Sequence, residues 1–391
     1  MNMNTAGHAI IYLDHNATTP VHPKVVEALL PFLTEKFGNP SSIHWAGRAV
    51  KGAVEEARER VAYLVGCEPG EVVFTASGTE ADNMAIKGVA AALAGRGNHI
   101  VATRVEHPAV VNPLLHLAQH GFAVTWLDVD GDGLLDPQRL EGALTDRTIL
   151  VCAMTANNET GVLFPLREIA EIAVRRKVYL HCDAVQAAGK LPLGFRESGI
   201  SLLALSGHKL HAPKGVGALV IRRGVKCHPL IHGGAQERNR RGGTENVAGI
   251  VAFGTACEIA AATMAEEMAR LKLLRDRLEE GVLARIPGSR VNGSRKRRLP
   301  TTTNISFVGV EADSLLMALD LEGIAASSGS ACSSGTLKLS PVLSAMGIAP
   351  EVARGSIRFS LGRGNTEEEI DRVLEVLPGI VARMRRGGDG S

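Results

Sequence analysis

The sequence predicts an α/β fold, with a mostly parallel sheet in a large domain (residues 20–260) and a smaller α+β domain (residues 1–19 and 261–391). Short apolar runs alternate with helical patterns between about residue 71 and residue 221. Such alternation implies right-handed crossovers and a sheet that helices cover on both faces. A long helical pattern over 247–285 then leads into the smaller domain.

Apolar spacing and turn residues set the expected bounds of each element. A short strand at Tyr12 precedes helices over 23–36 and 48–65, and an Ala-rich helix is expected over 81–93. The pattern over 247–285 has no cap in its middle and predicts one bent helix or two. The large sheet is expected to contain strands at 72–75, 100–103, 123–127, 149–153, 178–182, 202–205 and 217–221. The smaller domain is expected to contain strands at 304–307 and 356–360 and helices at 312–321 and 366–384.

Composition argues against several classes of function. The 391 residues are 45% apolar and 21% charged, and the net charge of +2 gives no reason to expect a nucleic acid or a membrane surface as partner. We see no signal peptide at the N-terminus, and no apolar run approaches the roughly 20 residues that span a bilayer. The six cysteines include no Cys-x-x-Cys pair, which is typical of reduced thiols in a cytoplasmic protein. All except Cys332 are expected to be small core residues: Cys67, Cys152, Cys182, Cys227 and Cys257.

Lys209 is the residue around which the predicted chemistry is arranged. The apolar run 202–205 is expected to be a buried strand, and it ends abruptly at Ser-Gly-His-Lys. Desolvation at the mouth of a buried strand disfavours the charged form of a lysine. Two interpretations are open: the side chain bends out to solvent, or it forms a Schiff base with a carbonyl group or with pyridoxal phosphate.

The turn Ser77-Gly78-Thr79 leads from a predicted strand into a helix. Free N–H groups and the helix dipole favour an anion there, although a plain N-cap by Ser77 or Thr79 is the simpler interpretation. The sequence contains no Gly-x-x-x-x-Gly-Lys-Ser/Thr and no Gly-x-Gly-x-x-Gly that opens a strand–helix unit. A single phosphate group is therefore favoured over a nucleotide.

Three more polar groups follow predicted strands. Asp183 needs a positive or hydrogen-bonding partner, which an arginine, a helix terminus or a protonated pyridine nitrogen would provide. His107 is either structural, or it stacks on a flat cofactor and moves protons. The polar segment 157–161 follows the next strand. Because ligands bind at the carboxyl ends of the strands in an open α/β sheet, all five turns predict one shared site.

Two candidate groups lie in the smaller domain. Cys332 occupies the small, polar, Gly-rich stretch 325–335, where it is either an accessible nucleophile or a free surface cysteine in a linker. Arg358, on a predicted strand, suits bidentate capture of a substrate carboxylate. His116 and His120 are more typical of a polar helix face than of a metal site, and no intrinsic metal site is predicted.

Several segments together resemble the cysteine desulfurases, which are class V, fold-type I (aspartate aminotransferase-like) enzymes dependent on pyridoxal phosphate. The resemblance runs from about residue 10 to about residue 375. Within it, residues 106–110 and 241–246 are most similar to the nitrogen-fixation (NifS-type) branch. The matching segments are 12–19, 37–42, 106–110, 156–161, 183–186, 206–209, 241–246, 327–332 and 358–360.

The resemblance implies a role for each candidate residue. Lys209 would carry the Schiff base, His107 would stack on the pyridine ring and handle protons, and Asp183 would pair with the ring nitrogen. Arg358 would bind the substrate carboxylate, and Cys332 would accept the sulfur. The other implied contacts to cofactor or substrate are Gly78, Thr79, Asn158, Gln186, Ser206, His208 and, from the second subunit of a homodimer, Thr244.

The implied function is the removal of sulfur from L-cysteine, which leaves L-alanine and a persulfide on Cys332. An iron–sulfur scaffold protein of the nitrogen-fixation type would receive the sulfur in the cytoplasm, with Cys332 able to act as a transient cluster ligand. Alternatives within the family are a selenocysteine lyase, a class V aminotransferase and a sulfur donor for a thiolation pathway. A non-catalytic sulfur carrier is the alternative outside it.

Overall fold

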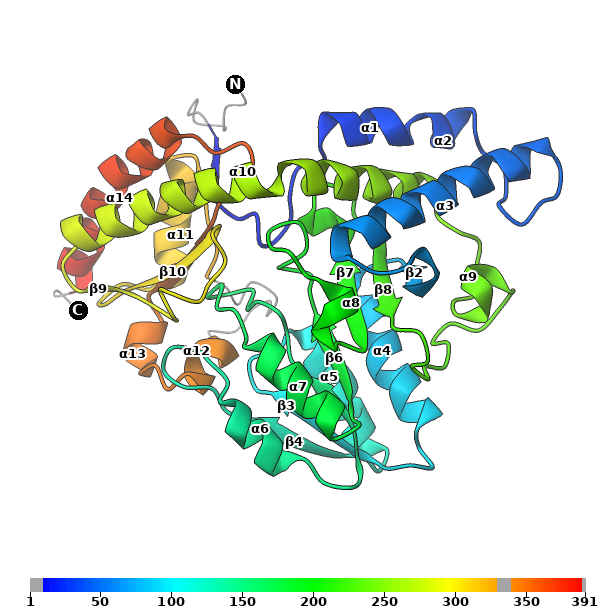
Figure 1. The fold of residues 1–391 in the computed structure, drawn as a ribbon. Helices are drawn as coiled ribbons and strands as arrows, with labels where there is room; N and C mark the ends of the chain where they lie inside the picture. The colour runs from blue at the N-terminus through cyan, green and yellow to red at the C-terminus, as the bar shows by residue number, and fades with distance from the viewer. Residues whose placement is uncertain (1–9, 329–338, 389–391) are drawn as a thin grey trace.

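The computed structural model describes residues 10–328 and 339–388. Within these ranges the strands form one sheet of seven strands, one of three and one of two. The part built on the seven-stranded sheet is called the larger body here, and the part built on the three-stranded sheet the smaller body (Figure 1). The predicted α/β class is confirmed.

The seven-stranded sheet is mostly parallel, as predicted. Among the described strands of this sheet, only β8 is antiparallel to its neighbours, which are β7 and β2. Strands β2 and β7 therefore run in the same direction. The carboxyl ends of all the strands except β8 therefore lie at one edge of the sheet. In spatial order the strands are β2 (Val72–Thr75), β8 (Gly217–Ile221), β7 (Leu202–Ser206), β6 (Tyr179–Asp183), β5 (Thr148–Cys152), β3 (His99–Thr103) and β4 (Ala123–Leu127).

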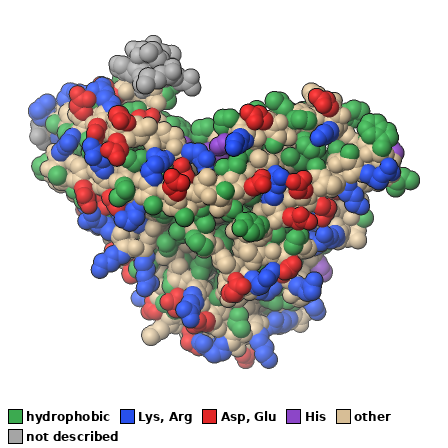
Figure 2. Space-filling model, turned by 45° about the horizontal axis from the view of Figure 1, so that its top comes forward, with side chains coloured by type: hydrophobic (Ala, Val, Ile, Leu, Met, Phe, Trp, Pro, Cys, Tyr) green, Lys and Arg blue, Asp and Glu red, His purple; other side chains and the backbone are tan. Residues whose placement is uncertain are grey.

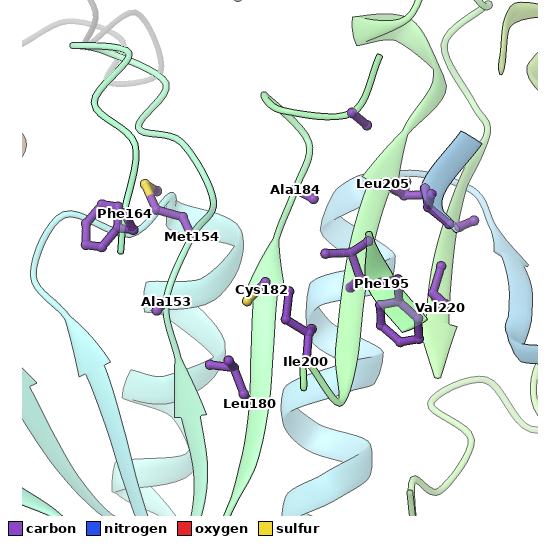
Figure 3. Packing of buried hydrophobic residues seen from close by; sticks show 14 of the residues in the cluster. Ala153, Met154, Phe164, Leu180, Cys182, Ala184, Phe195, Ile200, Leu205 and Val220 are labelled. Atoms are coloured by element: carbon purple, nitrogen blue, oxygen red, sulfur yellow. The ribbon is translucent and has the colours of Figure 1, made fainter. Parts of the chain in front are cut away.

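Strand β7 is apolar along its length because both faces of the sheet are covered. Successive strand residues point to opposite faces, so Leu203 and Leu205 pack into one core cluster while Leu202 and Ala204 pack into another. Figure 3 shows the first of these clusters, to which Phe195 also belongs. These four residues are fully buried, and the strand ends one residue later at Ser206, where the polar turn begins.

Helices cover the sheet, and proline divides one that was predicted as continuous. The pattern over 23–36 forms two helices, because Pro31 has no N–H and its ring disfavours a continuous helix. The helix predicted over 48–65 begins earlier, at Trp45, where the His44 ring accepts a hydrogen bond from the Gly47 N–H. The helices of the larger body are α1 (Pro23–Leu29), α2 (Pro31–Thr34), α3 (Trp45–Val65), α4 (Gly78–Ala92), α5 (Pro108–Gln119), α6 (Pro137–Ala143), α7 (Leu166–Arg175), α8 (Phe195–Ser198) and α9 (Gln236–Asn239), with 3₁₀ turns η1 (Pro69–Glu71) and η2 (Gly207–Lys209).

Helix α10 (Val247–Arg285) is one continuous helix of 39 residues that spans both bodies (Figure 1). It packs closely on α3, since a Cβ at Gly254 would lie only 2.6 Å from the Cα of Ala57. Contrary to the sequence expectation, α10 contains an apolar stretch long enough to cross a membrane by length and composition. Of that stretch, 56% is buried inside the fold, as in the core helix of a soluble protein.

The smaller body has its own apolar core and includes the N-terminal strand. Strand β1 (Ile11–Tyr12) pairs in parallel with β11 (Ile324–Ala325), so the N-terminal strand joins the C-terminal part of the chain. The predicted boundaries at residues 19 and 260 stay a prediction, because α10 crosses between the bodies without a break. Side chains of both charge signs are interspersed over the face drawn in Figure 2. The remaining elements are β9 (Ser289–Val291), β10 (Thr302–Phe307), α11 (Ala312–Leu321), α12 (Pro341–Ala345), α13 (Pro350–Ala353), β12 (Ser356–Ser360) and α14 (Glu367–Gly388).

Candidate active site

The five predicted polar turns meet at the carboxyl edge of the large sheet, around a cleft of about 310 Å³. Strands β2, β3, β5, β6 and β7 each deliver one turn to this edge. Strand β12 of the smaller body adds an arginine from across the cleft. The predicted site residues that line the cleft are Gly78, Thr79, His107, Asn158, Asp183, Gln186, Ser206, His208, Lys209 and Arg358.

Lys209 lies at the end of η2, directly after β7, and lines the cleft. Its Nζ donates hydrogen bonds to the backbone oxygens of Asn16 (2.5 Å) and Ala17 (2.6 Å). The side chain is half-buried, so it is held within the fold and does not extend into solvent. Of the two interpretations left open by the sequence, the structure favours an amine that faces the site.

Asp183 is the last residue of β6, and its carboxylate also lines the cleft. Its Oδ1 accepts a hydrogen bond from the Val185 N–H at 2.9 Å. Burial raises the pKa of this carboxyl group, although nearby His107, the Val185 N–H and Lys209 oppose the rise. Among the ion pairs between described residues, none joins Asp183 to an arginine. A buried carboxylate with these neighbours favours a ligand that brings a positively charged N–H donor.

His107 caps the N-terminus of α5, where its Nδ1 accepts a hydrogen bond from the Ala109 N–H at 3.1 Å. A neutral imidazole that accepts at Nδ1 carries its proton on Nε2. Burial lowers the pKa of His107, Asp183 opposes that shift, and Lys209 adds to it. The ring at the cleft is therefore flat and neutral near pH 7, and it can donate from Nε2.

The N-terminus of α4 forms another wall of the cleft. Ser77 caps it, because its hydroxyl accepts a hydrogen bond from the Glu80 N–H at 3.1 Å, so the plain N-cap is present as well. A Cβ at Gly78 would lie 2.7 Å from Cγ2 of Val185 and 3.2 Å from Cβ of Ser206. The first N–H groups of a helix have no partner inside it, and here they line a close-fitting wall suited to an anion.

His208 lines the same cleft as this helix terminus. Burial, together with the charges of Lys209 and Lys214, lowers the pKa of His208 to about 4. Its Nδ1 lies 3.1 Å from the hydroxyl of Thr18. The ring is therefore neutral near pH 7 and would contribute a hydrogen bond to an anion, not a charge.

Arg358 reaches the cleft from β12 and is almost fully buried. One of its terminal nitrogens donates to Oδ1 of Asp14 at 2.6 Å and the other to the backbone oxygen of Asn158 at 2.9 Å. Its Nε is buried and has no hydrogen-bond partner among the described residues. The guanidinium is thus held in one orientation at the wall of the cleft.

Comparison with known proteins identifies the family. The family model described as "Aminotransferase class-V" matches residues 11–373. The chain belongs to this family. The cysteine desulfurase IscS of Dictyoglomus turgidum is 51% identical over 375 residues (96% of this chain, 95% of the relative). Cysteine desulfurase 1 of Trichormus variabilis is 52% identical over 377 residues (96% and 94%).

Solved structures extend the likeness to three dimensions. A protein described as NifS-like aligns with a TM-score of 0.91 and 37% identity, over 96% of this chain and 100% of that chain. A structure described as SspA in complex with cysteine aligns with a TM-score of 0.80 and 33% identity, over 90% and 98%. The predicted family, with its aspartate aminotransferase-like fold, is confirmed.

This aminotransferase family depends on pyridoxal phosphate, and the cleft fits that cofactor. The buried carboxylate of Asp183 suits a protonated ring nitrogen, and the flat ring of His107 suits stacking. The N-terminus of α4 at Gly78 suits the phosphate, and Lys209 provides the amine. The cofactor prediction is confirmed, while the individual residue roles stay predictions.

Replacing Gly78 with alanine is expected to weaken the binding of pyridoxal phosphate by about tenfold or more. The added methyl group would lie too close to Val185 and Ser206, so the wall would have to shift where the phosphate is expected. The measurement is a titration of apoprotein with the cofactor, followed by visible absorbance.

Gly95→Ala is the matched control, because a Cβ there meets nothing within 4 Å and the residue is exposed. It is expected to bind the cofactor as the wild type does. Unchanged affinity in Gly78→Ala would show that the phosphate does not lie against this wall.

Sequence reasoning missed two residues that the fold brings to the site. Asn16 accepts hydrogen bonds from Lys209 and from Nε2 of Gln186 through its backbone oxygen, and its own side chain donates to Thr302 and to the backbone of Asn158. Lys190 lies four residues after Gln186 and donates to it. Asn16 belongs to the segment 12–19 that carried the resemblance, so that segment was the available signal.

Sequence reasoning also missed a buried pair beside Asp183. His181, two residues earlier on β6, makes a 2.9 Å contact through Nε2 with Asp82 of α4, and both side chains are fully buried. Burial lowers the pKa of His181 to about 4 and raises that of Asp82, so the two groups meet as a neutral imidazole and a carboxyl that holds its proton more tightly than usual.

One predicted residue does not line the cleft, and another cannot be compared with it. Thr244 is exposed and does not line it, so the contact predicted from a second subunit stays a prediction. Cys332 lies outside the described residues. The rings of His116 and His120 are in contact, with centroids 4.2 Å apart and planes tilted by 38°. In the part of the chain that the structure describes, no group of three or more His, Cys, Asp or Glu side chains is arranged to hold a metal ion.

Proposed function

We propose that this protein is a cysteine desulfurase, which removes sulfur from L-cysteine and releases L-alanine. The observation that carries the proposal is the single cleft that contains Lys209, Asp183, His107 and Arg358. Relatives that are about half identical over nearly the whole chain, and are named cysteine desulfurases, support the choice of substrate.

Pyridoxal phosphate, when bound, supplies an aldehyde and an electron-withdrawing ring that eases loss of the substrate's Cα proton. The amine of Lys209 would hold the cofactor covalently and, when free, would be placed to take that proton. Asp183 would keep the ring nitrogen protonated. Nε2 of His107, which carries the ring proton, would donate to atoms of the substrate next to the ring.

Arg358 would hold the substrate carboxylate and so fix which atom faces the reacting groups. Its guanidinium is already oriented by Asp14 and Asn158, and its buried Nε has no partner in the part of the chain that the structure describes. Binding of the carboxylate next to this group lets the substrate enter without leaving an unpaired charge in the cleft.

Arg358→Lys is expected to raise KM for cysteine by about tenfold or more, with a smaller effect on kcat. Lysine keeps the positive charge but loses the planar fork and the Nε donor. Steady-state alanine production gives both constants. An equal fall in kcat at unchanged KM would assign Arg358 to the chemical step and not to substrate binding.

Cys332 would be the sulfur acceptor. Its thiolate attacks the sulfur of substrate cysteine, a sulfur–sulfur bond forms, the carbon–sulfur bond breaks, and the electron pair and a proton pass to the carbon of the departing alanine. The atoms balance: one thiol and one cysteine give one persulfide and one alanine. The five described thiols are poor alternatives, because burial raises the pKa of every one: Cys67, Cys152, Cys182, Cys227 and Cys257.

The biological setting is also part of the proposal. We propose a cytoplasmic homodimer in which Thr244 of each subunit contacts the cofactor held by the other. The sulfur would pass to an iron–sulfur scaffold protein, since several relatives carry the name IscS. A specific role in nitrogen fixation stays a prediction.

Mass spectrometry after incubation with ³⁴S-labelled cysteine tests the function. One added labelled sulfur on the Cys332 peptide, with an equal amount of alanine, is the expected result. Alanine without a labelled persulfide would overturn the proposal. Alanine formed only when a 2-oxo acid is present would indicate an aminotransferase, and activity with selenocysteine alone a selenocysteine lyase. A protein that cannot be loaded with pyridoxal phosphate would indicate a sulfur carrier.

A further inference from the structure

A second lysine lies directly behind the cofactor cleft. Lys190 is only 9% exposed, and its Nζ lies 3.2 Å from Oε1 of Gln186 and 3.4 Å from Oδ1 of Asn16. Both acceptors are neutral amide oxygens. A buried ammonium group normally has a carboxylate partner, so a lysine whose hydrogen-bond acceptors among the described residues are amide oxygens is costly to keep unless it serves the site.

The groups that face Lys190 are mainly basic. Lys190 and Lys209 both line a cavity of about 60 Å³ that Asp183 does not line, whereas Lys209 and Asp183 both line the cofactor cleft. The acid among the described residues of this cavity is Glu267 of α10, which pairs with Arg270 at 3.5 Å. The titratable and charged groups that line the cavity or act on Lys190 are His15, His22, Lys209, His211, Glu267, Arg358 and Arg363.

Burial is the main reason that the pKa of Lys190 falls to about 7, and the charges of Lys209 and Arg358 add to it. The ammonium form therefore prevails only below neutral pH, and the neutral amine above it. His15 does not compensate, because burial lowers its pKa to about 3. Lys190 is thus expected to change its charge near neutral pH.

The hydrogen bonds of Lys190 fix the orientation of Gln186. Oε1 of Gln186 accepts from Lys190, and Nε2 donates to the backbone oxygen of Asn16 at 2.9 Å. A primary amide has two N–H groups, so the second one remains available to the cleft that Gln186 lines. If the amide were flipped, its nitrogen would face the donor of Lys190 and its oxygen the carbonyl of Asn16. Lys190 therefore makes Gln186 a donor toward the cofactor.

We propose that Lys190 is a positioning residue of the cofactor cleft, which fixes Gln186 as a hydrogen-bond donor and places a second amine behind Lys209. A donor toward the cofactor stabilises an anionic oxygen on its ring. A positive charge near Lys209 disfavours the addition of a proton to the cofactor attached to that lysine. The inference rests on the family's pyridoxal phosphate chemistry and holds for any amino-acid substrate.

Lys190→Met tests both effects without any substrate. Both effects oppose protonation of the loaded cofactor, so their loss is expected to raise the pH midpoint of its visible absorbance change by about one unit. Cofactor affinity is expected to fall several-fold. Lys190→Gln keeps a donor but no charge, so it should bind the cofactor nearly as well as the wild type while its midpoint still rises.

Lys214→Met is the matched control, because Lys214 is exposed and its charge also acts on the site, through His208. It is expected to shift the midpoint little. Wild-type midpoints in both Lys190 variants, at wild-type affinity, would overturn the inference. If Lys190→Met unfolds, which thermal unfolding would reveal, Lys190→Gln decides alone. Failure of the wild type to bind pyridoxal phosphate would instead count against the proposed function.

Discussion

Replacing Lys209 with alanine is expected to lower cysteine turnover by about 10³-fold or more, because this amine is assigned both the attachment of the cofactor and the removal of the Cα proton. The two measurements are alanine release and intact mass after borohydride reduction. Wild-type protein is expected to gain the mass of one cofactor, and the variant is expected to gain none. The cleft would keep its other contacts, so the variant should still bind the cofactor non-covalently.

Lys214→Ala is the control for this experiment, since it removes a lysine five positions away that is exposed. It should gain the cofactor mass and turn over cysteine like the wild type. A Lys209→Ala protein that still carries one covalent cofactor after reduction would show that another amine forms the bond, and Lys190 would then be the first candidate.

The strands of the large sheet were predictable because their signals are local. Both faces of β7 are covered, so burial forces an unbroken apolar run that ends where the backbone leaves the sheet at Ser206. The same holds for the turn after β2, where the strand ends at Thr75 and Ser77 caps the helix that follows. Their convergence followed from a parallel sheet, whose carboxyl ends share one edge.

Contacts between distant segments could not be read from the sequence. Asn16 binds Ser360, Thr302 and Lys209, which are separated from it by 344, 286 and 193 positions. Nothing local distinguishes it from a solvent-exposed turn asparagine. Lys190 follows Gln186 at a helical spacing that is common to many surface lysines, so only the fold reveals its burial.

Local sequence signals also failed to predict some helices and strands correctly, because other features of the chain oppose them or the element is too short. The apolar spacing over 23–36 favours one helix, but Pro31 divides it into α1 and α2. The pattern over 247–285 left one helix or two open, and packing on α3 keeps it whole. Strands β9 and β11 have three and two residues, which is too short for a period-2 pattern to emerge.

Replacing Cys332 with alanine is expected to abolish sulfur transfer while cofactor binding stays intact. Without the thiolate no group is assigned to attack the substrate sulfur, so alanine and sulfide release should fall by about 10²-fold or more. The visible spectrum should still change when cysteine is added, because Lys209, Asp183 and Arg358 remain. Sulfide release with a reductant and stopped-flow absorbance separate the two steps.

Cys227→Ala is the matched control, because Cys227 is the described cysteine that is not fully buried. Burial raises the pKa of Cys227 to about 12, so it is protonated and unreactive near pH 7, and its loss should leave sulfur transfer unchanged. A fall in activity in this variant, together with full activity in Cys332→Ala, would assign the nucleophile to Cys227 in the larger body. Loss of the spectral change in Cys332→Ala would instead mean that the cysteine helps to bind substrate, which a sulfur acceptor alone does not require.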